Sequence, residues 1–65
     1  MFRSKTSRLF EAIREGSGEE VVELLERRAN PNARKRGVPA LVEAVTHGNM
    51  AAVLALLAAG AEAEP

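Results

Sequence analysis

Residues 9–29, LFEAIREGSGEEVVELLERRA, return as residues 41–61, LVEAVTHGNMAAVLALLAAGA, when the sequence is shifted by 32 positions. Between the identical residues, apolar positions keep their character even where the residue type changes. A fixed period of this length indicates that the chain is built from two copies of one structural unit. The identical pairs are Leu9/Leu41, Glu11/Glu43, Ala12/Ala44, Gly16/Gly48, Val21/Val53, Leu24/Leu56, Leu25/Leu57 and Ala29/Ala61.

Each copy has the pattern of two short helices separated by a glycine. In the first copy, an apolar stripe marks a helix that we expect to end at Gly16, because glycine tolerates the left-handed conformation of a helix C-terminus. Ser17 and Glu20 have the spacing of a capping box, which predicts the start of the next helix. The second copy repeats this scheme, with Asn49 as the expected N-cap and Gly60 as the expected end.

The copies are joined by residues 30–38, NPNARKRGV, where proline, asparagine and glycine favour a turn over a helix. We expect an exposed loop there, followed by a third helix that Pro39 opens. Apolar residues make up 46% of the chain and aromatic residues only 3%. This composition, rich in alanine, valine and leucine, favours thin and closely packed helices. The predicted fold class is therefore all-α, in the order helix, helix, long turn, helix, helix.

The 32-residue unit resembles the ankyrin repeat, which consists of two antiparallel helices and a protruding turn. Residues 37–49, GVPALVEAVTHGN, are similar to the first helix of that family and the glycine after it. Residues 56–61, LLAAGA, and more loosely residues 24–33, LLERRANPNA, are similar to its closing Leu-Leu-x-x-Gly-Ala pattern. The resemblance implies two ankyrin-type helix-turn-helix repeats stacked as a short solenoid.

Two departures from the family's pattern are expected to weaken local order. Phe10 and Val42 stand where the family has a histidine that ties neighbouring loops together by hydrogen bonds. Arg28 replaces a glycine that is expected in a left-handed conformation. The loop between the copies is also one residue shorter than the family's norm, which accounts for a period of 32 residues.

We divide the chain into a basic N-terminal lead-in over residues 1–7, a first repeat with its turn over residues 8–36, and a second repeat over residues 37–65. The first repeat has a charged first helix, which suggests an N-terminal capping repeat. The second is expected to be internal, because its outer helix is apolar nearly all round. About three repeats are normally needed to bury a continuous core, so we expect a longer array, a partner or a second copy to cover Leu54 and its neighbours.

The resemblance implies a non-catalytic module that binds another protein through its turn tips and the concave face of its first helices. Three contiguous cations on the turn would suit an acidic partner segment. For packing against a further repeat or a second copy, we expect Val53, Leu54 and Leu57. The residues that the resemblance assigns to partner binding are Arg14, Glu15, Arg34, Lys35, Arg36, Val38, Thr46 and His47.

The sequence gives little support for metal, cofactor, nucleic-acid or membrane functions. The chain has no cysteine and a single histidine, so we expect no metal site and no cofactor. Nine basic residues balance nine acidic ones, and no aromatic platform accompanies the basic turn, so only salt-sensitive, nonspecific nucleic-acid binding would follow. The longest apolar run is too short to cross a membrane. We expect an intracellular, non-enzymatic protein, and self-association through the second repeat is the alternative function.

Overall fold

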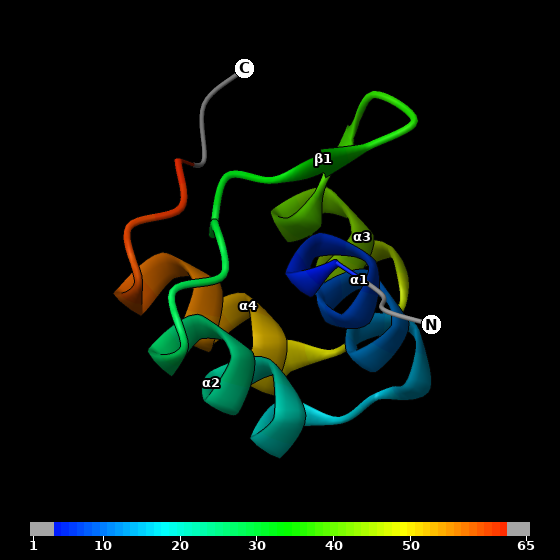
Figure 1. Ribbon diagram of the computed structural model, residues 1–65. Helices are drawn as coiled ribbons and strands as arrows, with labels where there is room; N and C mark the ends of the chain where they lie inside the picture. Colours follow the sequence, from blue (N-terminus) through cyan, green and yellow to red (C-terminus); the bar gives the residue numbers. More distant parts are fainter. Residues whose placement is uncertain (1–3, 63–65) are drawn as a thin grey trace.

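Four helices and one two-stranded hairpin make up residues 4–62, the part of the chain that the computed structural model describes (Figure 1). The fold is mostly helical, as predicted, but it also contains a small antiparallel sheet where the sequence indicated only a turn. No helix in this range is long and apolar enough to cross a bilayer. The elements are α1 (Lys5–Glu15), α2 (Gly18–Glu26), β1 (Arg34–Lys35), β2 (Val38–Pro39), α3 (Ala40–Thr46) and α4 (Met50–Ala58).

The starts of α2 and α4 and the end of α1 lie at the predicted capping residues, whereas α4, which was expected to end at Gly60, has Ala59 as its C-cap residue. Ser17 Oγ accepts a hydrogen bond from the Glu20 amide at the start of α2, over 3.1 Å. Asn49 Oδ1 accepts one from the Ala52 amide at the start of α4, also over 3.1 Å. Gly16 ends α1 with a φ of 81°, in the left-handed region that glycine adopts without steric penalty. These contacts confirm that each copy contains two helices with a glycine between them.

Two predicted boundaries fall elsewhere in the structure. Ser4 caps α1 by accepting a hydrogen bond from the Ser7 amide, so the boundary placed at residue 7 lies inside this helix. Pro39 does not open α3 but precedes it as the N-cap residue, with an extended ψ of 149°, and it belongs to β2. The outer ends of the predicted lead-in and second repeat, residues 1–3 and 63–65, lie outside the described residues.

The repeat of the sequence is also a repeat of backbone hydrogen bonds. The bounds of α4 are those of α2 shifted by 32 residues. After α2, the Ala29 amide donates to Leu24 O over 3.0 Å, and after α4, the Ala61 amide donates to Leu56 O over 2.9 Å. Two further matched pairs are Ser17 N to Ala12 O with Asn49 N to Ala44 O, and Gly16 N to Ile13 O with Gly48 N to Val45 O.

We name residues 4–32 the first unit and residues 37–62 the second unit. The two units lie side by side, with α1 packed against α3 and α2 packed against α4 (Figure 1). Gly18 on α2 makes a very close approach, because a Cβ atom there would lie 2.5 Å from the Cβ of Ala51 on α4. The fully buried core side chains between the helices include Leu9, Phe10, Ile13, Val21, Leu56 and the alanines Ala12, Ala40, Ala44 and Ala52.

The segment after α2 holds the two units together at their ends. Asn32 accepts a hydrogen bond from the Glu62 amide through Oδ1, over 2.8 Å, although the two residues are far apart in sequence. Asn30 Oδ1 accepts one from the Asn32 amide over 2.9 Å and thereby shapes the turn that presents Asn32. A hydrogen bond from Glu62 to Asn32 therefore links the end of the second unit to the turn at the end of the first.

Because of the close approach at Gly18, we expect Gly18→Ala to destabilise the protein, although this substitution usually stabilises a helix. Gly18→Ala normally favours a helix, but here the new methyl group meets Ala51, so we expect the free energy of unfolding to fall by about 1–2 kcal/mol. Urea denaturation followed by circular dichroism measures the change. The double variant Gly18→Ala/Ala51→Gly removes the opposing methyl group and should recover part of the loss. A stabilised Gly18→Ala variant would contradict the contact.

Arg28 has a φ of 73°, in the position that Gly60, with a φ of 102°, occupies in the second unit. This confirms the predicted left-handed residue, which costs a non-glycine side chain about 1 kcal/mol. We expect Arg28→Gly to raise the free energy of unfolding by about that amount. Arg28→Ala removes the same charge but keeps the strain, so its stability should stay close to that of the parent. Equal gains in both variants would assign the effect to charge instead.

Candidate functional site

The basic segment between the units is a β-hairpin. β1 and β2 pair antiparallel, with Lys35 opposite Val38, and Arg36 and Gly37 form the two-residue turn with φ values of 54° and 79°. Positive φ at both central residues is the pattern of a type I′ turn, which matches the twist of the strands. The predicted loop is thus a hairpin, in which Arg34 and Arg36 are exposed as expected and Lys35 is half-buried. The missed signal is the Arg36-Gly37 pair, in which arginine stands where such turns prefer asparagine.

A groove of about 440 Å³ lies between this hairpin and the helices α1 and α3. Three of its lining residues are cations, one is a carboxylate and two are apolar. The ring of Phe10 is almost inaccessible to solvent, so the cations form the more accessible part of the lining. A groove with this lining is suited to an extended, negatively charged chain with a small apolar group. The lining residues are Phe10, Arg14, Lys35, Arg36, Val38 and Glu43.

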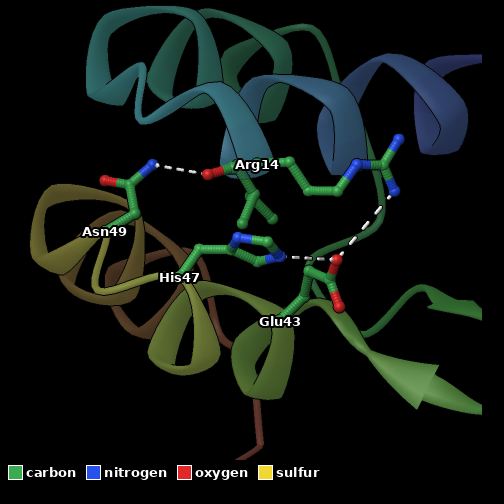
Figure 2. A network of polar contacts seen from close by, with 5 residues as sticks. Arg14, Glu43, His47 and Asn49 are labelled. Carbon is green, nitrogen blue, oxygen red and sulfur yellow. Dashed lines mark hydrogen bonds and ion pairs between the residues drawn. The ribbon is translucent and has the colours of Figure 1, made fainter.

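Glu43 holds together a polar cluster at one side of the groove (Figure 2). Its Oε2 atom lies 3.2 Å from His47 Nε2 and 3.9 Å from Arg14 Nη1. His47, the C-cap residue of α3, lies one helical turn after Glu43, whereas Arg14 reaches across from α1. The carboxylate is mostly buried, with 18% of its side chain exposed, so its charge is directed at these two partners. The groove therefore keeps a net positive lining.

The structure brings together only part of the predicted binding set. Arg14, Lys35, Arg36 and Val38 line one groove, and His47 lies beside it through Glu43. The three others, Glu15, Arg34 and Thr46, are exposed but do not line this groove.

Phe10 and Glu43 were missed as lining residues. The sequence predicted Phe10 only as a departure from the family's histidine, and Glu43 only as one of the repeated residues. They occupy different positions of the repeat, since Phe10 is the equivalent of Val42 and Glu43 the equivalent of Glu11, so no pattern within one copy marks them as a pair.

The three α4 residues that were predicted to pack against a neighbour differ in their exposure. Leu54 and Leu57 are exposed, with 64% and 43% of their surface accessible. Val53 is not part of that surface, because it is half-buried and packs against the core. The reason is its register, since Val53 is the equivalent of Val21, which is a fully buried core residue in the first unit.

Candidate metal ligands do not cluster in the part of the chain that the structure describes. Within residues 4–62, no three histidine, cysteine, aspartate or glutamate side chains gather closely enough to hold a metal ion. The residues that line the groove include no hydroxyl or thiol nucleophile. The arrangement offers charge, a small apolar surface and a fixed shape, which are the means of non-covalent binding.

Asn49 joins the two units from a buried position. While its Oδ1 caps α4, its Nδ2 donates to Ile13 O in the first unit over 3.3 Å (Figure 2). Its equivalent in the first unit is Ser17, which caps α2 through Oγ alone. Asn49 therefore caps its helix as Ser17 does and also makes a hydrogen bond between the two units.

The double role of Asn49 predicts an unusual order of stabilities. Asn49→Ser keeps a cap and loses the bond to Ile13, for a cost of about 1 kcal/mol. Asn49→Asp is as good a cap, but its second carboxylate oxygen faces the Ile13 carbonyl, so we expect a further loss of about 1 kcal/mol at neutral pH.

Urea denaturation at neutral pH and at roughly pH 3 separates these effects, because an aspartic acid side chain protonates near pH 4 and can then donate. The aspartate variant should therefore approach the serine variant as the pH falls. Equal stability of the two variants at both pH values would contradict the bond to Ile13.

Comparison of the chain with models of protein families, with curated proteins and with solved structures gave no match. The groove and the exposed surface of α4 are therefore interpreted from their geometry and chemistry.

Proposed function

We propose that the chain is a non-catalytic protein-interaction module, made of two ankyrin-type repeats stacked as a short solenoid, that binds an acidic segment of a partner protein. The observation that carries this proposal is the groove beside the hairpin, with Arg14, Lys35 and Arg36 around a small apolar floor. The repeated helix bounds and hydrogen bonds of the two units support the repeat architecture.

The distribution of charge supports an acidic partner. Every lysine and arginine lies at or before Arg36, although the whole chain has no net charge. The hairpin segment thus carries three consecutive cations, and two of them, Lys35 and Arg36, line the groove together with Arg14. Among the described lining residues the one carboxylate is that of Glu43, which contacts Arg14 and His47. An approaching carboxylate therefore meets a surface whose positive charges exceed its negative ones.

The shape of the groove supports a protein segment over a compact small molecule. The site lies between a hairpin and two helices, so an extended chain that follows the hairpin could contact all three elements. The hairpin is short and closed by a tight turn, which fixes the positions of Lys35 and Arg36 before binding. A surface fixed in advance loses less conformational entropy when a partner binds.

Binding of a defined acidic peptide tests the proposal. The probe is a short synthetic peptide of glutamate and serine around one leucine, titrated into the isotopically labelled chain and followed by amide NMR shifts. We expect shifts at the groove residues, and at least about tenfold weaker binding to Lys35→Glu/Arg36→Glu, because two attractive charges become repulsive. Raised salt should weaken binding to the parent chain.

A matched control variant is Lys5→Glu/Arg8→Glu. It changes the net charge by the same amount, at exposed residues of α1 that do not line the groove, and it should bind the peptide nearly as well as the parent. A second probe replaces each glutamate of the peptide with lysine and should not bind. Equal weakening in both charge variants, or equal binding of both peptides, would count against the groove.

Self-association through the second unit is the alternative function, and the exposed side chain of Leu54 is the observation that favours it. A complex that joins two such surfaces would bury this side chain on both copies. Sedimentation velocity of the parent and of Leu54→Glu separates the two functions, because only self-association predicts a dimer that the substitution disrupts. If the parent chain stays monomeric at high concentration, self-association is rejected and the interaction module is the remaining function.

A further inference from the structure

One carboxylate oxygen connects the groove to the single histidine of the chain. Glu43 Oε2 lies 3.2 Å from His47 Nε2 and 3.9 Å from Arg14 Nη1, so two side chains compete for the same atom (Figure 2). Arg14 and Glu43 line the groove, whereas His47 contacts Glu43 from outside the lining. We name these three residues the Glu43 cluster.

The two partners of Glu43 differ in how their charge depends on pH. Arginine side chains keep their positive charge throughout the range in which proteins are studied, whereas histidine is the side chain that gains a charge as the pH falls from 8 to 5. A neutral His47 donates an N–H to Glu43 but carries no charge that balances the carboxylate. Within the cluster, Arg14 is then the group that balances Glu43, and its charge is less available to a ligand in the groove.

Protonation of His47 changes this balance. The imidazolium ring then places a full positive charge 3.2 Å from the oxygen, nearer than Arg14. The side chain of Glu43 is mostly buried, so water screens this ion pair less than it screens a pair at the surface. The side chain of Arg14 is 44% exposed, so its guanidinium can turn from Glu43 toward the groove without leaving a buried position.

The other charged groups near His47 come from few elements. Helix α3 packs against α1, α4 and β2, and neither α4 nor β2 contains an ionisable side chain. Helix α1 brings Arg14 and, next to it in sequence, the exposed Glu15, while the hairpin adds Lys35 and Arg36 to the lining of the groove. Because the chain has no cysteine and no second histidine, His47 is its one side chain of a type that ordinarily titrates between pH 5 and 8.

We propose that protonation of His47 strengthens the binding of an acidic segment to the groove, because it frees Arg14 from Glu43. The groove then offers the charges of Arg14, Lys35 and Arg36 to the ligand, while the charge of Glu43 is balanced by a residue outside the lining. This inference rests on the proposed function and adds a regulation of the same groove by pH. The chain holds its acidic partner more tightly as the pH falls from 8 toward 5.5.

Peptide titrations at pH 8 and pH 5.5 test the inference. The probe is the same acidic peptide of glutamate, serine and leucine, whose carboxylates stay mostly ionised at both pH values. NMR of the labelled chain at constant salt gives three quantities, which are the affinity, the protonated fraction of the His47 ring and the shift of the Arg14 Nε–H signal. We expect roughly threefold tighter binding at pH 5.5. The affinity and the Arg14 signal should both change in step with the protonated fraction of His47.

Three variants separate the Glu43 cluster from other effects of pH. His47→Gln keeps an N–H donor but does not titrate, so its affinity should be the same at pH 8 and pH 5.5. Glu43→Gln removes the charge that holds Arg14, so it should bind at pH 8 about as tightly as the parent chain does at pH 5.5 and should lose most of the pH dependence. The matched control, His47→Gln/Ala58→His, returns a histidine at an exposed residue of α4 that does not line the groove, and it should show no pH dependence.

The outcomes distinguish this inference from the proposed function. Equal affinity of the parent chain at both pH values, or an unchanged pH dependence in His47→Gln, would overturn the inference and leave the proposed function unaffected. An unchanged pH dependence in Glu43→Gln would also overturn it, because the ring would then act without releasing Arg14. The same holds for a pH dependence that returns with Ala58→His, which would assign the effect to net charge. A peptide that binds at neither pH value would overturn the proposed function, and the pH dependence of binding with it.

Discussion

The spacing between α2 and α4 is the constraint on which the other contacts depend, and it is set by small side chains. Gly18 leaves no room for even a methyl group beside Ala51, and alanines continue the contact along α4. At this spacing α1 and α3 also meet, so that Arg14 reaches Glu43 and Asn49 reaches Ile13. The groove needs the same approach, because its lining is drawn from both units and from the hairpin that joins them. A larger residue at the contact would therefore disturb features on the other side of the molecule.

The local parts of this fold were predictable because their causes are local. Ser17 and Asn49 cap helices through bonds to amides three residues away, so spacing alone revealed them. The left-handed conformation at Arg28 was expected from the resemblance, whose pattern has a glycine at this position, and Gly60 also has a positive φ. The hairpin was not predicted, since its turn places an arginine at positive φ, where sequence patterns lead one to expect asparagine or glycine. Two strands of two residues each also leave too short a pattern of alternation to recognise.

The candidate site was predicted only in part, for a different reason. The resemblance assigned Arg14, Lys35, Arg36 and Val38 to binding, and these four do share a groove. Which neighbours complete it depends on the rotation between the two units, which no pattern within one copy specifies. Glu43 illustrates this. Its contact with His47 follows from the i,i+4 spacing of a helix, whereas its contact with Arg14 on α1 follows only from the packing of the two units. Val53 was misplaced because its neighbour Leu54 is exposed whereas Val53 itself packs against the core.

The bond from Asn49 to Ile13 has a consequence for how the chain loses its structure. One residue serves both as the start of a helix in the second unit and as the partner of a carbonyl in the first. If the second unit alone unfolded, α4 would lose its N-cap hydrogen bond to Asn49. The buried Ile13 side chain would become exposed, and the Ile13 carbonyl would lose the hydrogen bond from Asn49 Nδ2. Nearest-neighbour coupling of this kind penalises half-folded states. The two units should therefore open and close together, so that the cooperative unit of folding is the pair and not the single repeat.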